Sequence, residues 1–167
     1  DATLRFPDFR AEERTFALVT QLAGRSGRSA RGGRVIVQTL DPEADAIRRA
    51  AAHDTPGFLA DELERRRELA YPPFSHLIRV DLAGVDVPRL DAAAAAIRAA
   101  LDATLPAGAR ALGPAPRFRV RGRERRQVLI KAEDRAATVA AVREAVERVV
   151  ADGATKGVAL AVDVDPA

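Results

Sequence analysis

The second half of the chain carries two hydrophobic periods that follow one another in a regular order. Every second residue is apolar near residues 76–82, which predicts a half-buried strand. From Pro88 the apolar residues recur every three or four positions along one stripe, which predicts a helix. Further strands are predicted near residues 110–112, 117–121, 126–132 and 158–164, with a helix capped by Asp134 before the last of them. The resulting β-α-β-β-α-β order predicts a ferredoxin-like α+β domain, in which two helices cover one face of a sheet.

The first forty residues have the pattern of one edge of an α/β domain. A helical rhythm runs over residues 9–23, and Asp8 is placed to cap its start. Residues 34–40 form a short, nearly continuous apolar run, which is typical of a buried strand in a parallel sheet. We therefore interpret residues 1–40 as one edge of a domain whose other strands are missing from this sequence.

Two more helices are predicted between this edge and the second half. They cover about residues 41–53 and 56–69, and the prolines of Tyr71-Pro72-Pro73-Phe74 end the second one. Its charged run, residues 61–68, is interpreted as a solvated helix face, with a phosphate contact as the alternative. The chain then divides into three parts, which are residues 1–40, a helical linker over 41–72 and an α+β domain over 73–167.

Composition excludes several classes of site. The chain has 167 residues, no cysteine and two histidines far apart, so we expect neither a disulfide nor a metal site within it. No apolar run approaches the length of a membrane helix, and we expect no membrane partner. The chain also lacks methionine and so starts without an initiator residue. Combined with the motif over residues 21–28 that is identified below, this leads us to expect the C-terminal fragment of a larger protein.

Positive charge is concentrated in one stretch. The net charge is +3, yet residues 117–131 hold seven basic residues against Glu124 alone, a balance of +6 that leaves −3 elsewhere. In an extended chain Arg117, Arg119, Arg121 and Arg123 would share one face, with Phe118 and Val120 pointing into the core. Such a ladder suits nucleic acid or an acidic peptide. The alternative is an edge strand that charge protects from unwanted pairing.

A second basic group lies at the end of the first predicted helix. Gln21 and Arg25 project from one helix face, four residues apart, and Arg28 follows beyond two glycines. Two guanidinium groups presented in this way suit a phosphate. The alternative is an ordinary helix end with basic residues and a glycine cap.

These blocks carry a family resemblance. The pattern Q-x-x-G-R-x-G-R over residues 21–28 resembles the last conserved motif of superfamily 2 helicases. Together with Pro7-Asp8-Phe9-Arg10-Ala11 it resembles the PriA family of replication-restart helicases, as do three later blocks. They are Tyr71-Pro72-Pro73-Phe74, Leu112-Gly113-Pro114-Ala115-Pro116 and Val162-Asp163-Val164-Asp165-Pro166.

The resemblance implies an enzyme. Residues 1–40 would end the second RecA-like helicase lobe, and residues 73–167 would be an S10-like domain. The full-length protein would be an ATP-dependent 3′→5′ DNA helicase that recognises and remodels stalled or abandoned replication forks for replication restart and primosome assembly. ATP and Mg²⁺ would be bound mainly upstream, and the zinc site of the family would lie upstream too. With no G-x-x-x-x-G-K-[ST] loop, this fragment alone should not hydrolyse ATP.

The resemblance also implies roles and partners. Gln21, Arg25 and Arg28 would be catalytic, the arginines by neutralising phosphate charge. Forked and single-stranded DNA, single-stranded DNA-binding protein and other primosome proteins would be the partners, in the bacterial cytoplasm at the nucleoid. DNA would contact Arg117, Arg119, Arg121 and Arg125, whereas Arg123 and Gln127 would receive the acidic tail of single-stranded DNA-binding protein. Family members often have aromatic residues where this chain has Glu124 and Arg126.

Two other functions remain open at this point. One is a DNA- and protein-binding restart factor without ATPase activity. The other is an S10-like RNA-binding module, although such a module would not need the arginine motif and the helices that precede residue 72.

Overall fold

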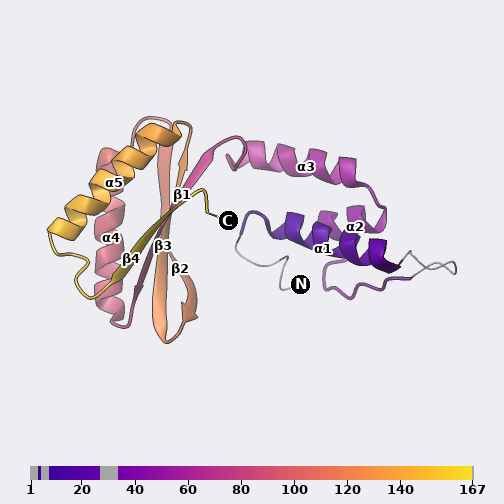
Figure 1. Ribbon diagram of the computed structural model, residues 1–167, viewed down its shortest axis with the longest axis horizontal. Helices are drawn as coiled ribbons and strands as arrows, with labels where there is room; N and C mark the ends of the chain where they lie inside the picture. Colours follow the sequence, from indigo (N-terminus) through magenta and orange to yellow (C-terminus); the bar gives the residue numbers. More distant parts are fainter. Residues whose placement is uncertain (1–3, 5–7, 27–33, 167) are drawn as a thin grey trace. The chain divides into compact units, whose positions relative to one another are not determined.

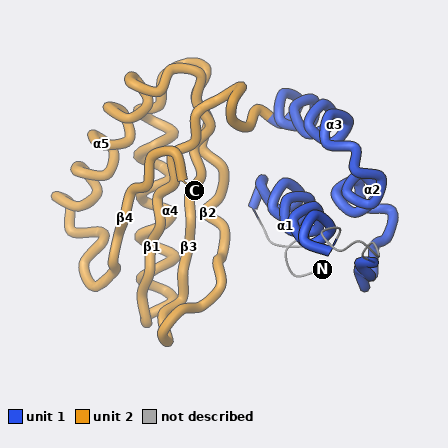
Figure 2. The backbone as a smooth tube through the Cα atoms, turned by 45° about the vertical axis from the view of Figure 1, so that its right-hand side comes forward, with its two compact units in different colours: residues 1–69 blue, residues 70–167 orange. Residues whose placement is uncertain are grey.

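The computed structural model describes residue 4 and residues 8–26 and 34–166 (Figure 1). Arg28 and the glycine-rich stretch after it lie outside the described residues. The chain divides into two compact units, residues 1–69 and 70–167 (Figure 2). This division falls close to the boundary expected at about residue 72, and each unit is considered by itself.

The described residues of unit 1 form three helices around a small apolar core. They are α1 (Ala11–Ser26), α2 (Asp45–Ala51) and α3 (Thr55–Glu68). The rings of Phe16 and Phe58 stack at 4.1 Å between centroids, and Val19, Ala46 and Ala50 complete the buried cluster. Asp8 lies three residues before α1, and its Oδ1 accepts a hydrogen bond from the backbone N–H of Arg10 at 2.9 Å, so it caps the turn that leads into the helix.

The charged run on α3 differs from the predicted solvated face. Glu62 is buried and pairs with both Arg65 and Arg66, the latter at 2.7 Å. These two arginines also reach Glu12 and Glu13 on α1, at 3.2 and 2.5 Å. The solvated-face interpretation is therefore wrong for this part of the run, because these charges join α3 to α1.

The predicted strand over residues 34–40 is not observed. These residues have no regular secondary structure, and Ile36 and Leu40 are about four-fifths exposed, at 80% and 79%. A strand needs a neighbour for its backbone N–H and C=O groups, and the described residues of unit 1 contain no other strand. We expected the other strands of this edge to be missing from the chain, and without a neighbour among the described residues the apolar run forms no strand.

Unit 2 is a four-stranded antiparallel sheet with two helices on one face (Figure 1). Its elements are β1 (His76–Gly84), α4 (Val87–Thr104), β2 (Ala109–Val120), β3 (Arg123–Ala132), α5 (Arg135–Ala151) and β4 (Ala159–Val164). The strand order is β2-β3-β1-β4. The predicted β-α-β-β-α-β order of elements is confirmed, with the difference that the two strands predicted over residues 110–121 form one strand.

The core of unit 2 lies between the sheet and the helices. Alternate residues of β1, namely Ile78, Val80 and Leu82, are fully buried against α4 and α5. The opposite residues of β1, including Arg79 and Asp81, lie on the other face of the sheet, which the two helices leave open. Asp134 Oδ1 accepts from the N–H of Ala137 at 3.0 Å and so caps α5, as predicted.

A bulge explains why β2 is continuous through a Gly-Pro pair. Leu112 pairs with Leu129 and Ala115 with Gln127, so three steps along β2 match two steps along β3. Gly113 has φ +97, which only glycine adopts without strain. A Cβ there would lie 2.8 Å from the carbonyl oxygen of Gln127. The Leu-Gly-Pro block therefore sets the register of β2 on β3.

Candidate functional site

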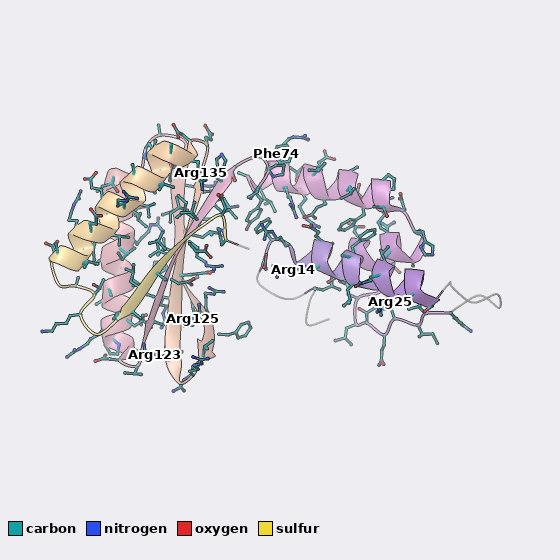
Figure 3. All side chains as sticks on the ribbon, viewed as in Figure 1. Arg14, Arg25, Phe74, Arg123, Arg125 and Arg135 are labelled. Atoms are coloured by element: carbon teal, nitrogen blue, oxygen red, sulfur yellow. The ribbon has the colours of Figure 1, made fainter. Side chains whose placement is uncertain are left out.

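The arginine motif begins on an exposed face of α1. Gln21 and Arg25 are both exposed, and helical geometry places them opposite the buried Phe16. Arg25 lies in the last turn, and Figure 3 shows it at the other end of the helix from Arg14. Among the described residues Arg25 has no hydrogen-bond or ion-pair partner, so its guanidinium group is available to a phosphate. Arg28 falls outside the described residues.

A network of charged side chains crosses the open face of the sheet in unit 2. Its centre is Asp81, which accepts hydrogen bonds from Arg79 Nε at 2.8 Å and Arg117 Nη1 at 2.7 Å. Arg125 Nη2 lies 3.6 Å from the same carboxylate, and Arg79 also binds Asp163 at 2.8 Å. Asp81 and the three arginines have side chains that are 15 to 26% exposed, whereas the side chain of Asp163 is 46% exposed. Three arginines against two aspartates leave a local balance of only +1, so most of this positive charge is neutralised within the sheet.

The β2–β3 hairpin continues beyond this network. The pairing of β1 with β3 ends at Gly84 and Glu124, whereas β2 and β3 pair further, to Val120 and Arg123. Arg121 and Gly122 form the two-residue turn, with φ +50 and +76. Positive φ at both positions is the requirement of a type I′ hairpin turn. The hairpin tip, defined here as residues 118–123, therefore has no neighbouring strand outside the hairpin.

Two apolar side chains at the tip contradict the prediction that they enter the core. Phe118 is 69% exposed and Val120 is 47% exposed. A second register shift separates Arg117, which pairs with Arg125, from Val120, which pairs with Arg123. One extra residue in β2 breaks the strict alternation on which the prediction relied. The Arg-Gly turn was the available sequence signal, because it places Phe118 close to the end of the hairpin.

The positive charge at the tip is less balanced than that at the base. Arg121 and Arg123 are exposed, and their guanidinium groups have no ion-pair or hydrogen-bond partner in the part of the chain that the structure describes. Arg119 lies 3.6 Å from Glu124 and donates to the carbonyl of Gly122 at 3.1 Å. An open hollow beside the tip is lined by Ala83, Val120, Arg121, Arg123 and Arg125. The arginine side chains that are exposed and lack a partner among the described residues therefore lie at the tip, where they are available to bind an anion.

The two residues expected to receive an acidic peptide tail lie on one strand. Arg123 and Gln127 are four positions apart on β3, so they face the same side about 13 Å from each other. Gln127 is half-buried opposite Asp81 of β1, which adds a negative charge beside it. Arg126, at a position where the family often has an aromatic residue, pairs with Asp91 of α4 at 2.7 Å.

A shielded lysine lies on the same open face. The Lys131 ammonium group sits over the ring of Tyr71, 3.4 Å from its centroid. Burial, helped by the nearby charge of Arg110, holds the pKa of Lys131 below its usual range. This contact holds the segment Tyr71-Pro72-Pro73 against the sheet within unit 2.

Two features relevant to the expectations are absent from the described residues. The structure brings no three His, Cys, Asp or Glu side chains of residue 4, 8–26 or 34–166 into a group that could hold a metal ion. Within the same ranges no helix is both long and apolar enough to cross a membrane.

Comparison with known proteins agrees with the resemblance seen in the sequence. A family model described as the primosomal protein N C-terminal domain matches residues 67–167. A replication restart protein PriA from Bacillus subtilis (strain 168) is 34% identical over 168 residues, covering 99% of this chain and 21% of the relative. The relative of the same description from Treponema pallidum (strain Nichols) is 43% identical over 134 residues, covering 79% and 20%. This chain spans about a fifth of the length of these two relatives, and it belongs to the PriA family of replication restart proteins.

Proposed function

We propose that this chain is the C-terminal part of an ATP-dependent 3′→5′ DNA helicase that recognises and remodels stalled or abandoned replication forks. The activity would serve replication restart and primosome assembly in the bacterial cytoplasm, at the nucleoid. The observation that carries the proposal is the similarity to a replication restart protein along 99% of the chain, which includes the arginine motif as well as the matched domain.

Unit 1 would contribute to ATP hydrolysis as the end of the second RecA-like lobe. Arg25 fits a phosphate contact because it is exposed at a helix end and has no partner among the described residues. Gln21 lies one turn earlier on the same face, where it could orient that arginine. ATP and Mg²⁺ would be held mainly by upstream parts of the protein, and Arg28 would add a second charge.

Unit 2 would bind DNA and partner proteins. The sequence assigned DNA binding to Arg117, Arg119, Arg121 and Arg125, and the peptide tail to Arg123 and Gln127. The ion pairs of Arg117 and Arg125 with Asp81 favour a narrower DNA contact, centred on Arg119, Arg121 and Arg123 at the tip. Single-stranded DNA-binding protein and other primosome proteins remain the proposed protein partners.

The test is DNA-stimulated ATP hydrolysis by the complete gene product. Arg25→Ala should lower the rate on forked DNA by about 10³-fold or more, because a charge that stabilises the transferring phosphoryl group is lost. Arg14→Ala is the matched control on the same helix, since Arg14 is paired with Asp8 at 2.9 Å, and it should stay within about twofold.

Two outcomes would contradict the proposal. Fork binding without ATP hydrolysis in the unaltered protein would leave a restart factor that only binds. Equal losses in both variants would mean that Arg25 acts through the fold of α1 and not at a phosphate.

A further inference from the structure

We propose that Phe118 stacks on an unpaired base of single-stranded DNA while the arginines of the hairpin tip hold the adjoining phosphates. The proposal rests on the DNA-binding part of the proposed function and adds a base contact to it. It would make the tip a detector of single-stranded DNA in addition to a site of charge attraction.

The exposure of Phe118 is the first observation. Its side chain is 69% exposed although the fold buries comparable rings, since Phe16 and Phe58 are exposed by only 7% and 2%. It lies level with Glu124, where the β1–β3 pairing ends, on a hairpin whose turn is formed by Arg121 and Gly122. A ring held on a rigid hairpin keeps much of its surface in water and loses little conformational entropy on binding.

The surrounding charge is the second observation. Arg119 precedes the turn, Arg121 is in it and Arg123 follows it, so three arginines lie within five positions of Phe118 along the hairpin. Only Arg119 has a carboxylate within 4 Å among the described residues, at 3.6 Å. Aromatic side chains combined with an uncompensated basic surface are the means by which proteins bind single strands without sequence preference.

A single strand fits this tip better than an acidic peptide or a duplex does. An acidic peptide could use the arginines and the apolar side chains that line the adjoining hollow, yet it offers no run of flat ring faces to an exposed phenyl ring. In a duplex the faces of the bases are stacked and closed to a side chain, whereas an unpaired base exposes its face. The structure therefore points to unpaired nucleotides.

The test measures the affinity of the 167-residue chain for fluorescein-labelled oligo(dT), and for the same strand annealed to oligo(dA). Phe118→Ala should weaken oligo(dT) binding roughly 5- to 100-fold, the effect of losing one stacked base, and should change duplex binding less. Val150→Ala removes an exposed apolar side chain from α5, outside the tip, and should stay within about twofold.

A tryptophan reporter tests the stacking itself. The chain contains no tryptophan, so Phe118→Trp introduces a single fluorophore that should keep the affinity and be quenched by oligo(dT). Val150→Trp, on the exposed side of α5, is the control and should not be quenched.

The outcomes separate this inference from the function on which it rests. If the unaltered chain binds no DNA, the proposed DNA-binding role of unit 2 fails. If it binds and Arg123→Ala weakens binding while Phe118→Ala does not, DNA binding stands and the stacking contact is overturned. If Phe118→Ala lowered the affinity for single strand and duplex equally, the stacking contact would also be overturned. The same holds if Phe118→Ala weakened only the binding of a poly-glutamate peptide.

Discussion

The base and the tip of the β2–β3 hairpin both carry arginine, in different surroundings. At the base, Arg117 and Arg125 meet Asp81, which lies on the neighbouring strand β1. At the tip, Arg121 and Arg123 are exposed and no partner for their guanidinium groups is found among the described residues. The base has a third strand beside it and the tip has none, because β1 ends opposite Glu124.

This difference teaches that the charge count of a stretch does not measure its capacity to bind anions. The six arginines of residues 117–126 look equivalent in the sequence, yet β1 and α4 supply carboxylates to three of them, Arg117, Arg125 and Arg126. Charge that is neutralised inside the fold stabilises the sheet and attracts a phosphate weakly. The tip arginines that have no carboxylate partner among the described residues keep their charge available to bind an anionic partner.

The largest expected effect concerns the base. Asp81→Ala should lower the free energy of unfolding by about 3 kcal/mol, because Arg79 and Arg117 lose a hydrogen-bonded partner in a partly shielded site. Asp91→Ala is the control, since its pair with Arg126 is more exposed at Asp91, and it should cost about 0.5 kcal/mol. Urea denaturation measures both. Equal costs would mean that the network at the base contributes no special stability.

The next effect concerns the bulge that sets the register of the base. Gly113→Ala should cost about 2 kcal/mol, because the new Cβ is strained at positive φ and also meets the carbonyl of Gln127. Gly153→Ala has the same kind of φ, +74, but no atom within 4 Å of the new Cβ, and should cost about 1 kcal/mol. Thermal unfolding of the two variants separates crowding from backbone strain. If the Gly113→Ala variant were as stable as Gly153→Ala, crowding at the bulge would make no contribution to the stability of the fold.

The smallest effect separates stability from binding at the tip. Arg121→Asn should raise the free energy of unfolding by about 0.5 kcal/mol, because asparagine accepts positive φ in a type I′ turn better than arginine does. The same change should weaken oligo(dT) binding several-fold, because one phosphate contact is lost. Arg119→Asn should weaken binding without the gain in stability. A loss of stability in Arg121→Asn would show that this arginine supports the fold.

The sequence predicted the regular parts of the molecule well and the interrupted parts poorly. The alternation of Ile78, Val80 and Leu82 and the cap at Asp134 depend on local patterns, and both predictions are confirmed. The burial of Phe118 was predicted wrongly, because one extra residue in β2 reverses an alternation and leaves little trace in composition. The partner of Arg117 lies 36 positions away, and no local pattern could reveal it.

Unit 1 shows the same limit in another form. Residues 34–40 have the composition of a buried strand, but strand formation depends on neighbours that the described residues of this unit do not supply. The run around Glu62 looked solvated because helix position alone cannot show which face a second helix covers. For Gln21 and Arg25 the sequence correctly placed both residues on one helix, and their catalytic role stays a prediction.

The measurement that most directly tests the contrast between base and tip is the dissociation constant for oligo(dT) of Arg123→Ala beside that of Arg117→Ala. The account predicts a loss of about fivefold for Arg123→Ala, together with a salt dependence that is smaller by about 0.7, as expected for one phosphate contact on a single strand. Arg117→Ala should stay within about twofold, because Asp81 already neutralises that charge. A loss in Arg117→Ala as large as that in Arg123→Ala would contradict the account.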